Sequence, residues 1–135
     1  MLLQPKKTKY RKSFKGKISG YERKVINIKL GKFGIKAMKS ARISAQQLEA
    51  LRKSLNKLLK NRGKIWLKIF PNIPATSKPI EVRMGKGKGQ IDYWFARINA
   101  GRILFELQGL PFSLNKQVLK LSKDKLSIPV KMIYN

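Results

Sequence analysis

Ser44-Ala45-Gln46-Gln47-Leu48-Glu49-Ala50-Leu51 begins the most strongly patterned stretch of this 135-residue chain, which continues to Gly63. Ser44 and Gln47 have the spacing of a helix capping box, in which each side chain bonds the other residue's backbone N–H. The leucines at 48, 51, 55, 58 and 59 recur on one helical stripe. We therefore predict a helix over residues 45–62 that buries this stripe, with Gly63 as its stop.

Strands are predicted on both sides of this helix, from alternation of apolar and polar residues over 25–30, 64–70 and 128–134 and from aromatic residues over 91–98. The predicted strands cover residues 25–30, 35–43, 64–70, 80–83, 91–98, 103–107 and 128–134. The turn at 99–102 predicts that 91–98 and 103–107 form a hairpin, and three prolines predict an irregular connection over 71–79. A shorter helix is predicted over 114–125, with Leu114, Val118, Leu121 and the stem of Lys125 facing inward. The fold class is therefore α+β, with two helices on a mainly antiparallel sheet.

The charge of the chain is extreme. It carries 32 Lys+Arg against 6 Asp+Glu, a formal net charge of +26, while 42% of its residues are hydrophobic. Such a chain can form one folded domain, and the imbalance indicates a polyanionic partner. We expect nucleic acid before an anionic membrane surface, and no apolar run approaches the length of a membrane span.

The first part of the chain is a basic arm. Residues 1–24 carry nine Lys and Arg side chains, with Tyr10, Phe14 and Tyr21 interleaved. The arm lacks periodicity, so we expect an irregular segment that its partner orders, followed by a single domain over 25–135. A solvated tail is the alternative, but interleaved aromatic rings can stack on bases or anchor the arm to the core.

A second basic segment reads Arg83-Met84-Gly85-Lys86-Gly87-Lys88-Gly89. Glycine permits positive φ and close approach of the backbone to a ligand, and the three cations suit phosphates. No Ser or Thr follows as in a P-loop, and Gln90 with no helix after it departs from the dinucleotide fingerprint. The segment therefore favours a bulky polyanion, with a plain hairpin tip as the alternative.

Catalytic chemistry has little support in this sequence. It contains no His and no Cys, which removes histidine-dependent nucleophilic catalysis and the usual zinc ligands. The six acids are scattered; Glu81 and Asp92 flank the glycine segment, so a two-carboxylate magnesium site there is the remaining metal alternative. We expect no catalytic residue, no metal and no cofactor.

Several segments resemble one known family in order along nearly the whole chain. They are Leu-Gln-Pro-Lys-Lys-Thr-Lys-Tyr-Arg-Lys (3–12), Gly-Lys-Phe-Gly-Ile-Lys-Ala (31–37), Arg-Ile-Ser-Ala-Gln-Gln-Leu-Glu-Ala (42–50), Gly-Lys-Ile-Trp-Leu-Lys-Ile-Phe-Pro (63–71), Lys-Pro-Ile-Glu-Val-Arg-Met-Gly-Lys-Gly-Lys-Gly (78–89), Tyr-Trp (93–94) and Gly-Arg-Ile-Leu-Phe-Glu-Leu-Gln-Gly (101–109). In these segments the chain resembles the large-subunit ribosomal protein L-sixteen family in its bacterial and organellar form.

The resemblance implies an α/β-hammerhead-like fold and a structural role in the large ribosomal subunit. The implied partners are large-subunit rRNA and neighbouring ribosomal proteins, with tRNA nearby, because the family lies beside the tRNA-accepting cleft near the peptidyl-transferase centre. The protein would be a monomer within the ribosome and would not contact a membrane. The residues that we expect at the rRNA are Lys6, Lys7, Lys9, Tyr10, Arg11, Lys12, Lys15, Lys17, Lys32, Lys36, Arg42, Arg83, Met84, Gly85, Lys86, Gly87, Lys88 and Gly89.

Two other functions and several compartments stay open at this point. A small architectural DNA-binding protein would also be basic and free of cysteine, and an RNA-modifying or RNA-cleaving enzyme is the third alternative. The chain has 24 Lys against 8 Arg, with many Ile and Asn, which hints at an AT-rich genome. We see no transit peptide, so we expect a ribosomal protein encoded in the mitochondrion, with a plastid or bacterial cytoplasm as alternatives.

Overall fold

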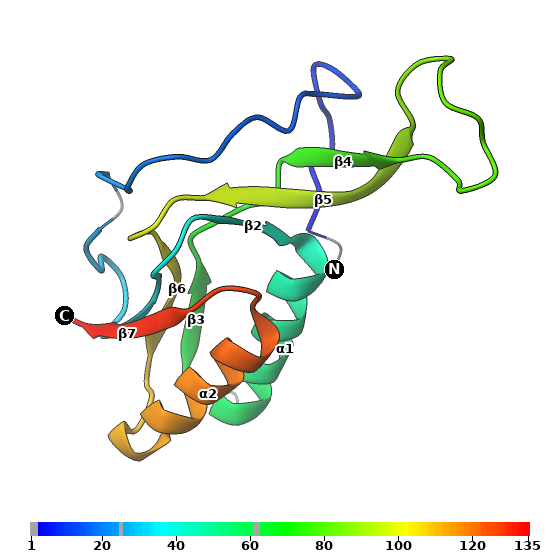
Figure 1. The fold of residues 1–135 in the computed structure, drawn as a ribbon. Coiled ribbons are helices and arrows are strands. Elements are labelled where there is room, and N and C mark those ends of the chain that lie inside the picture. The colour runs from blue at the N-terminus through cyan, green and yellow to red at the C-terminus, as the bar shows by residue number, and fades with distance from the viewer. Residues whose placement is uncertain (1–2, 25, 61–62) are drawn as a thin grey trace.

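The computed structural model describes residues 3–24, 26–60 and 63–135, which form two antiparallel sheets and two α-helices (Figure 1). The elements are β1 (Phe33–Ala37), β2 (Ala41–Ser44), α1 (Ala45–Leu59), β3 (Lys64–Leu67), β4 (Ile73–Ser77), β5 (Gln90–Ile98), β6 (Ile103–Gln108), η1 (Phe112–Leu114), α2 (Asn115–Lys125) and β7 (Val130–Tyr134). One sheet has the strand order β3-β6-β1-β7 and the other β2-β5-β4. The α+β fold class is confirmed.

Helix α1 follows the predicted pattern at its start and departs from it at its end. The Ser44 side chain accepts from the Gln47 N–H at 3.2 Å, and the Ser44 N–H donates to Gln47 Oε1 at 3.0 Å, so the capping box is formed. The helix ends at Leu59, and Lys60 takes the left-handed conformation expected of a glycine stop. Gly63 is required for another reason: a Cβ there would lie 2.6 Å from the carbonyl oxygen of Gln108, at the start of the β3–β6 pairing.

Both helices lie on one side of the four-stranded sheet (Figure 1) and share a core with it. Four leucines of the predicted stripe, at 48, 51, 55 and 59, are buried. Helix α2 is rotated relative to the prediction. Asn115, Val118 and Ser122 are its buried residues, while Leu121 is half-buried and Lys125 is exposed. In the strand that follows α2, β7, the alternate residues Val130 and Met132 are buried as expected.

The predicted hairpin of residues 91–98 and 103–107 is wrong, because β5 and β6 belong to different sheets. The chain bends at Gly101, where φ is +91°. The Gly101 N–H donates to the Ala37 carbonyl at 2.7 Å, and the Ala37 N–H donates to the Arg102 carbonyl at 2.9 Å. The turn therefore bonds to the end of β1, and β6 continues into pairing with β1 and β3.

Two further predictions for the chain before the glycine segment are also wrong. The predicted irregular stretch 71–79 contains β4, which pairs with β5 and places Pro74 opposite Trp94. Strand β4 is at the edge of its sheet, where the absent N–H of proline is tolerated. Residues 80–83 form no strand; the Val82 N–H instead donates to the Pro79 carbonyl at 3.2 Å, as in a turn.

The predicted strand 25–30 is replaced by an irregular segment held by a buried carboxylate, while Val25 lies outside the described residues. Glu106 Oε2 accepts from the N–H groups of Leu30, Gly31 and Lys29 at 2.7, 3.1 and 3.3 Å. Glu106 Oε1 lies 3.3 Å from Lys68 Nζ. Burial alone would raise the pKa of Glu106, but the backbone N–H donors and the Lys68 ammonium outweigh it, so the pKa is lowered.

Candidate nucleic-acid interface

The segment that joins β4 to β5 projects from the body of the protein as a long loop (Figure 1). Gly85, Lys86 and Gly87 have φ values of +102°, +52° and +85°. A Cβ on Gly85 or Gly87 would have no atom within 4 Å, so space does not require glycine there. The left-handed backbone does, because only glycine adopts it without strain.

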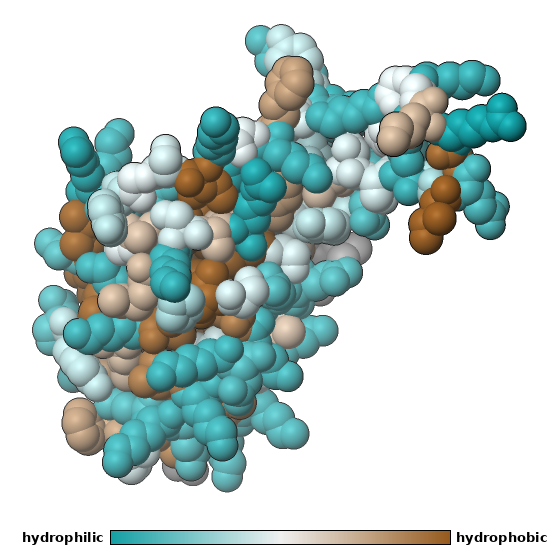
Figure 2. Space-filling model, viewed as in Figure 1, coloured by the Kyte–Doolittle hydropathy of each residue, from teal (hydrophilic) through white to brown (hydrophobic). Residues whose placement is uncertain are grey.

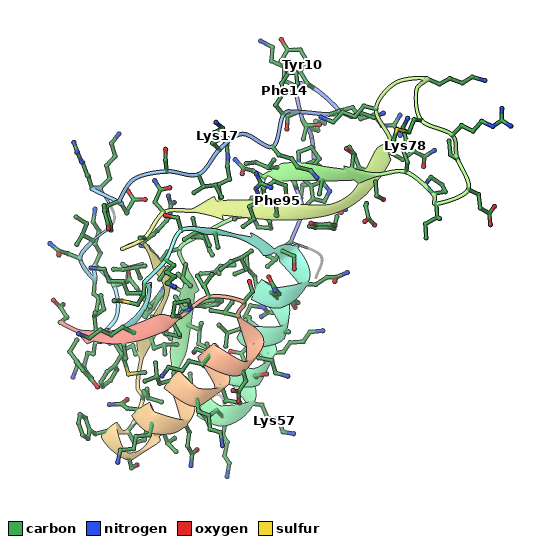
Figure 3. The ribbon with its side chains drawn as sticks, viewed as in Figure 1. Tyr10, Phe14, Lys17, Lys57, Lys78 and Phe95 are labelled. Atoms are coloured by element: carbon green, nitrogen blue, oxygen red, sulfur yellow. The ribbon has the colours of Figure 1, made fainter. Side chains whose placement is uncertain are left out.

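Gly89 and Lys78 close the base of this loop. A Cβ on Gly89 would lie 2.1 Å from the Ser77 carbonyl oxygen, so the two backbone segments touch where β4 ends and β5 begins. The Lys78 ammonium (Figure 3) donates to the Gly85 carbonyl and holds the loop back toward its base. The three glycines therefore differ in role: Gly85 and Gly87 set the conformation, and Gly89 permits a close approach.

The basic arm is fastened to the loop by reciprocal lysine contacts. Lys12 Nζ donates to the Lys88 carbonyl at 2.6 Å, and Lys88 Nζ donates to the Ser13 carbonyl at 2.5 Å. The same Lys88 ammonium lies 5.3 Å from the centre of the Phe14 ring, which is within cation–π range. We call residues 6–17 together with residues 83–89 the arm–loop surface. Each ammonium has three donors, so these contacts leave N–H groups for phosphates.

The middle of the arm is fixed to the three-stranded sheet at Gly16. Arg42 Nη2 donates to the Gly16 carbonyl at 2.8 Å, and the Arg42 guanidinium lies 5.6 Å from the centre of the Phe95 ring. Gly16 has a φ of +64°, and a Cβ there would lie 2.4 Å from Arg97 Nη1. The arm is irregular, as predicted, but two arginines from neighbouring strands set its path.

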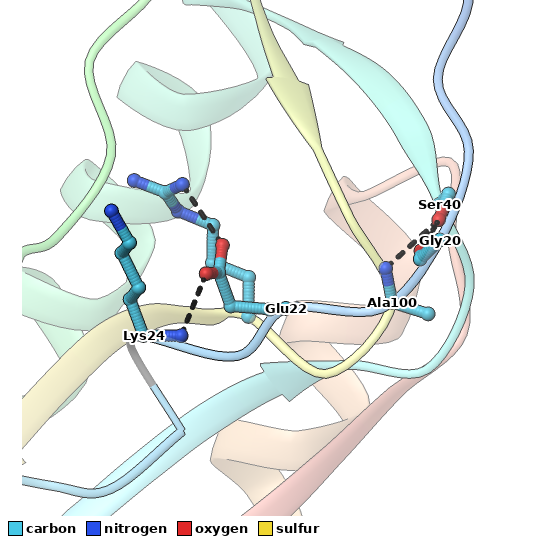
Figure 4. A network of polar contacts seen from close by, with 6 residues as sticks. Gly20, Glu22, Lys24, Ser40 and Ala100 are labelled. Atoms are coloured by element: carbon cyan, nitrogen blue, oxygen red, sulfur yellow. Dashed lines mark hydrogen bonds and ion pairs between the residues drawn. The ribbon is translucent and has the colours of Figure 1, made fainter.

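A polar network ties the end of the arm to the bend between the sheets (Figure 4). The Ser40 hydroxyl donates to the Gly20 carbonyl at 3.3 Å and accepts from the Ala100 N–H at 2.9 Å. The Glu22 N–H donates to the Ala100 carbonyl at 2.8 Å, and its carboxylate pairs with Arg102 at 3.1 Å. At the other end of the arm, Leu3 packs against the main core.

The structure brings together most of the residues predicted to contact RNA. Those of the arm and the loop are exposed apart from Gly89, and Arg42 is exposed beside the arm. Lys32 and Lys36 belong to another region: Lys32 precedes β1, with its carbonyl accepting from the Asn135 N–H at 3.0 Å, and Lys36 lies within β1. Among the described residues, neither has a recorded bond to the arm–loop surface.

Sequence reasoning missed Lys78 and Arg97 as residues that shape this surface. Lys78 lies outside the glycine-rich run, and Arg97 looks like an ordinary outward residue of a strand. Alternation along β5 was the only signal that could have placed Arg97 on the face toward the arm. Ile80 and Met84 are fully exposed on the loop; Met84 is among the expected RNA contacts, whereas Ile80 belongs to the strand predicted over 80–83. Figure 2 shows hydrophilic side chains over much of the visible face and apolar ones on the projecting loop.

The described residues hold no cluster of metal-ligating side chains. Within residues 3–24, 26–60 and 63–135, no group of three or more acidic, His or Cys side chains could hold a metal ion. In the same ranges, no helix has the length and apolarity needed to cross a bilayer. The arm–loop surface therefore remains the strongest candidate site.

Comparison with known proteins finds one family along nearly the whole chain. A family model described as "Ribosomal protein L16p/L10e" matches residues 5–133. A protein from Hyphomonas neptunium named "Large ribosomal subunit protein uL16" is 48% identical over 132 residues, which cover 98% of this chain and 96% of the relative. Proteins of the same name from Bartonella henselae and Bartonella bacilliformis are 47% and 46% identical with the same coverage. These matches do not support the DNA-binding alternative.

Proposed function

The chain belongs to the ribosomal protein L16p/L10e family, and we propose that its arm–loop surface is the principal contact with large-subunit rRNA. Family membership makes the protein a structural constituent of the large ribosomal subunit and not an enzyme. Its partners are therefore rRNA and other ribosomal proteins. The proposal concerns which residues make the RNA contact.

The observation that carries this proposal is the joining of arm and loop through Lys12 and Lys88. Two cationic segments repel each other across water, so a chain that holds them side by side concentrates positive potential. RNA phosphates are the polyanion that this potential attracts, and lysine and arginine contacts to phosphates fix register without reading sequence. Tyr10 and Phe14 are exposed within the same surface and offer faces for unstacked bases.

The remaining expected contacts are part of the same proposal. Arg42 extends the arm–loop surface, whereas Lys32 and Lys36 form a separate contact with RNA on the side of the four-stranded sheet. We propose that residues 1–24 act as an RNA-binding arm on a single rRNA-binding domain formed by 25–135. The resemblance of the loop segment supports a position near the tRNA-accepting cleft and the peptidyl-transferase centre, with the protein present as a monomer in the ribosome.

The compartment is a separate and finer proposal. A composition with 24 Lys against 8 Arg favours an AT-rich genome, which supports a mitochondrially encoded protein. The relatives found are bacterial, so a bacterial cytoplasmic ribosome is the alternative. Mass spectrometry of ribosomes purified separately from organelles and cytoplasm of the source cells tests this.

The RNA contact is tested by the salt dependence of binding to a large-subunit rRNA fragment. Each phosphate contact contributes about −0.7 to −0.9 to the log–log slope. Replacing Lys86→Ala and Lys88→Ala together should make the slope shallower by about 1.5. The charge-matched control is Lys116→Ala with Lys120→Ala, which removes two exposed lysines from α2. Equal slopes for the two double variants would show that only net charge matters.

A further inference from the structure

The projecting loop borders an open hollow of about 590 Å³. Pro79, Val82 and Ile91 supply apolar walls, while Lys86 and Lys88 supply cations. Pockets of this size and mixed lining suit a small planar group held by apolar contact and a few polar ones. A stretch of backbone phosphates alone would not need the apolar walls.

Asp92 also lines this hollow, and phosphate binding does not explain it. The acids Glu22, Glu49 and Glu106 each pair with a nearby cation. Glu81, Asp92 and Asp124 form no ion pair among the described residues, and of these three only Asp92 lines the hollow. The Asp92 carboxylate forms no hydrogen bond or ion pair with any residue that the structure describes. A free carboxylate beside RNA phosphates weakens binding by repulsion, unless it accepts a hydrogen bond from a donor on the RNA.

We propose that the hollow takes an unstacked nucleobase that carries an exocyclic amino group, and that Asp92 accepts the hydrogen bond of that group. A carboxylate accepts from the N4 amino group of cytosine, whereas uracil presents a carbonyl oxygen there and would be repelled. The apolar walls contact the base, and Lys86 and Lys88 reach the flanking phosphates. Single-stranded loops and bulges of RNA offer such bases. This inference rests on the proposed RNA contact and adds base selectivity to it.

The test compares binding of the full-length protein to short oligo(rC) and oligo(rU) of equal length at neutral pH and low salt. Equal lengths carry equal phosphate charge, so their affinity ratio isolates the base. We expect oligo(rC) to bind about five-fold more tightly than oligo(rU). Asp92→Asn keeps the shape of the side chain, removes the charge and adds an N–H donor that can bond the uracil carbonyl. It should raise both affinities and bring the ratio close to one.

The matched control is Glu81→Gln, which removes one negative charge from the same exposed loop at a residue outside the hollow. It should raise both affinities equally and preserve the ratio. A wild-type affinity ratio near one would overturn the inference. So would a ratio that Asp92→Asn leaves unchanged, or one that Glu81→Gln brings to one as Asp92→Asn does. Salt-sensitive binding without base preference would leave the proposed RNA contact standing. If the protein bound neither oligonucleotide, the inference and the proposed RNA contact would both be overturned.

Discussion

Glu106→Gln is the substitution that tests the structure most directly, because one buried carboxylate holds the irregular segment 29–31 against the sheet. The Glu106 side chain is 0% exposed, and its partner Lys68 is 22% exposed. Glutamine keeps the shape but accepts hydrogen bonds as a neutral group. Toward the Lys68 ammonium, glutamine presents either its amide NH₂ group or its carbonyl oxygen, which is a weaker acceptor than a carboxylate.

The expected cost follows from these contacts. Two of the three N–H donors lie at 2.7 and 3.1 Å, and each loses about 1 kcal/mol when its acceptor becomes neutral. The Lys68 ammonium loses its counter-charge but is partly hydrated, which adds about 1 kcal/mol. The sum is about 3 kcal/mol, at the lower end of the range for removing one partner of a buried ion pair.

Urea denaturation followed by circular dichroism measures this cost without adding salt. Glu49→Gln is the matched control, because Glu49 pairs with Arg52 at 2.7 Å but the two side chains are 16% and 35% exposed. The control should cost less than about 1 kcal/mol. If Glu106→Gln costs no more than Glu49→Gln, the buried carboxylate does not anchor the segment as argued here.

Acid should reproduce part of this loss in the wild type. The pKa of Glu106 is lowered from 4.5 in the folded protein. The stabilisation that Glu106 provides is therefore present above that unfolded value and is lost as pH falls through the folded pKa. As the pH is lowered, the urea midpoint should fall less steeply for Glu106→Gln than for the wild type. In the loop, Gly85→Val with Gly87→Val should reduce affinity for rRNA at least as much as removing the two loop lysines, since a β-branched residue at these φ values is strained. The free energy of unfolding of this double variant should stay close to that of the wild type. Unchanged affinity in filter binding would mean that these glycines are only a flexible tip. Gly89→Ala should instead lower the free energy of unfolding by about 1–3 kcal/mol, because its Cβ meets the Ser77 carbonyl.

The elements that the sequence predicted well are those whose signals are local. Ser44, Gln47 and the leucine stripe lie within one helix, so propensity, capping and periodicity agree there. Strand β5 (Gln90–Ile98) was likewise predicted, over 91–98, from the residue types within it. Where local signals conflict with long-range pairing, the prediction fails. Pro74 marked a break, yet an edge position accommodates it in β4.

Pairing between strands depended on contacts that are distant in sequence. The turn at residues 99–102 looked sufficient for a hairpin, but hydrogen bonds from Gly101 and Ala37 connect segments more than sixty residues apart. No pattern within residues 91–107 contains that information. The segment before β1 failed for the same reason: its backbone donors bond to Glu106, on a strand more than seventy residues away.

For the candidate site too, the sequence predicted the residue types but not how the fold groups them. Residue types alone singled out the arm and the loop as candidates, because phosphate contacts depend mainly on charge. Their association did not follow from type, since Lys88 and Ser13 are 75 residues apart. Lys32 and Lys36 have the same chemistry, but Lys32 directly precedes β1 of the other sheet and Lys36 lies within it, so charge alone grouped residues that the fold separates.

If the arm–loop surface contacts rRNA as proposed, the joined arm and loop couple RNA binding to folding. Holding them together in water opposes electrostatic repulsion in a chain of net charge +26, and the lysine bonds to main-chain carbonyls offset only part of it. Because the arm is already fixed at Gly16 and Lys88, RNA meets a preorganised surface and less ordering entropy is lost on binding. Phosphates then neutralise the repulsion, so RNA stabilises the fold in proportion to its affinity. On this proposal, the cations that repel one another in the free protein are the ones that hold it in the ribosome.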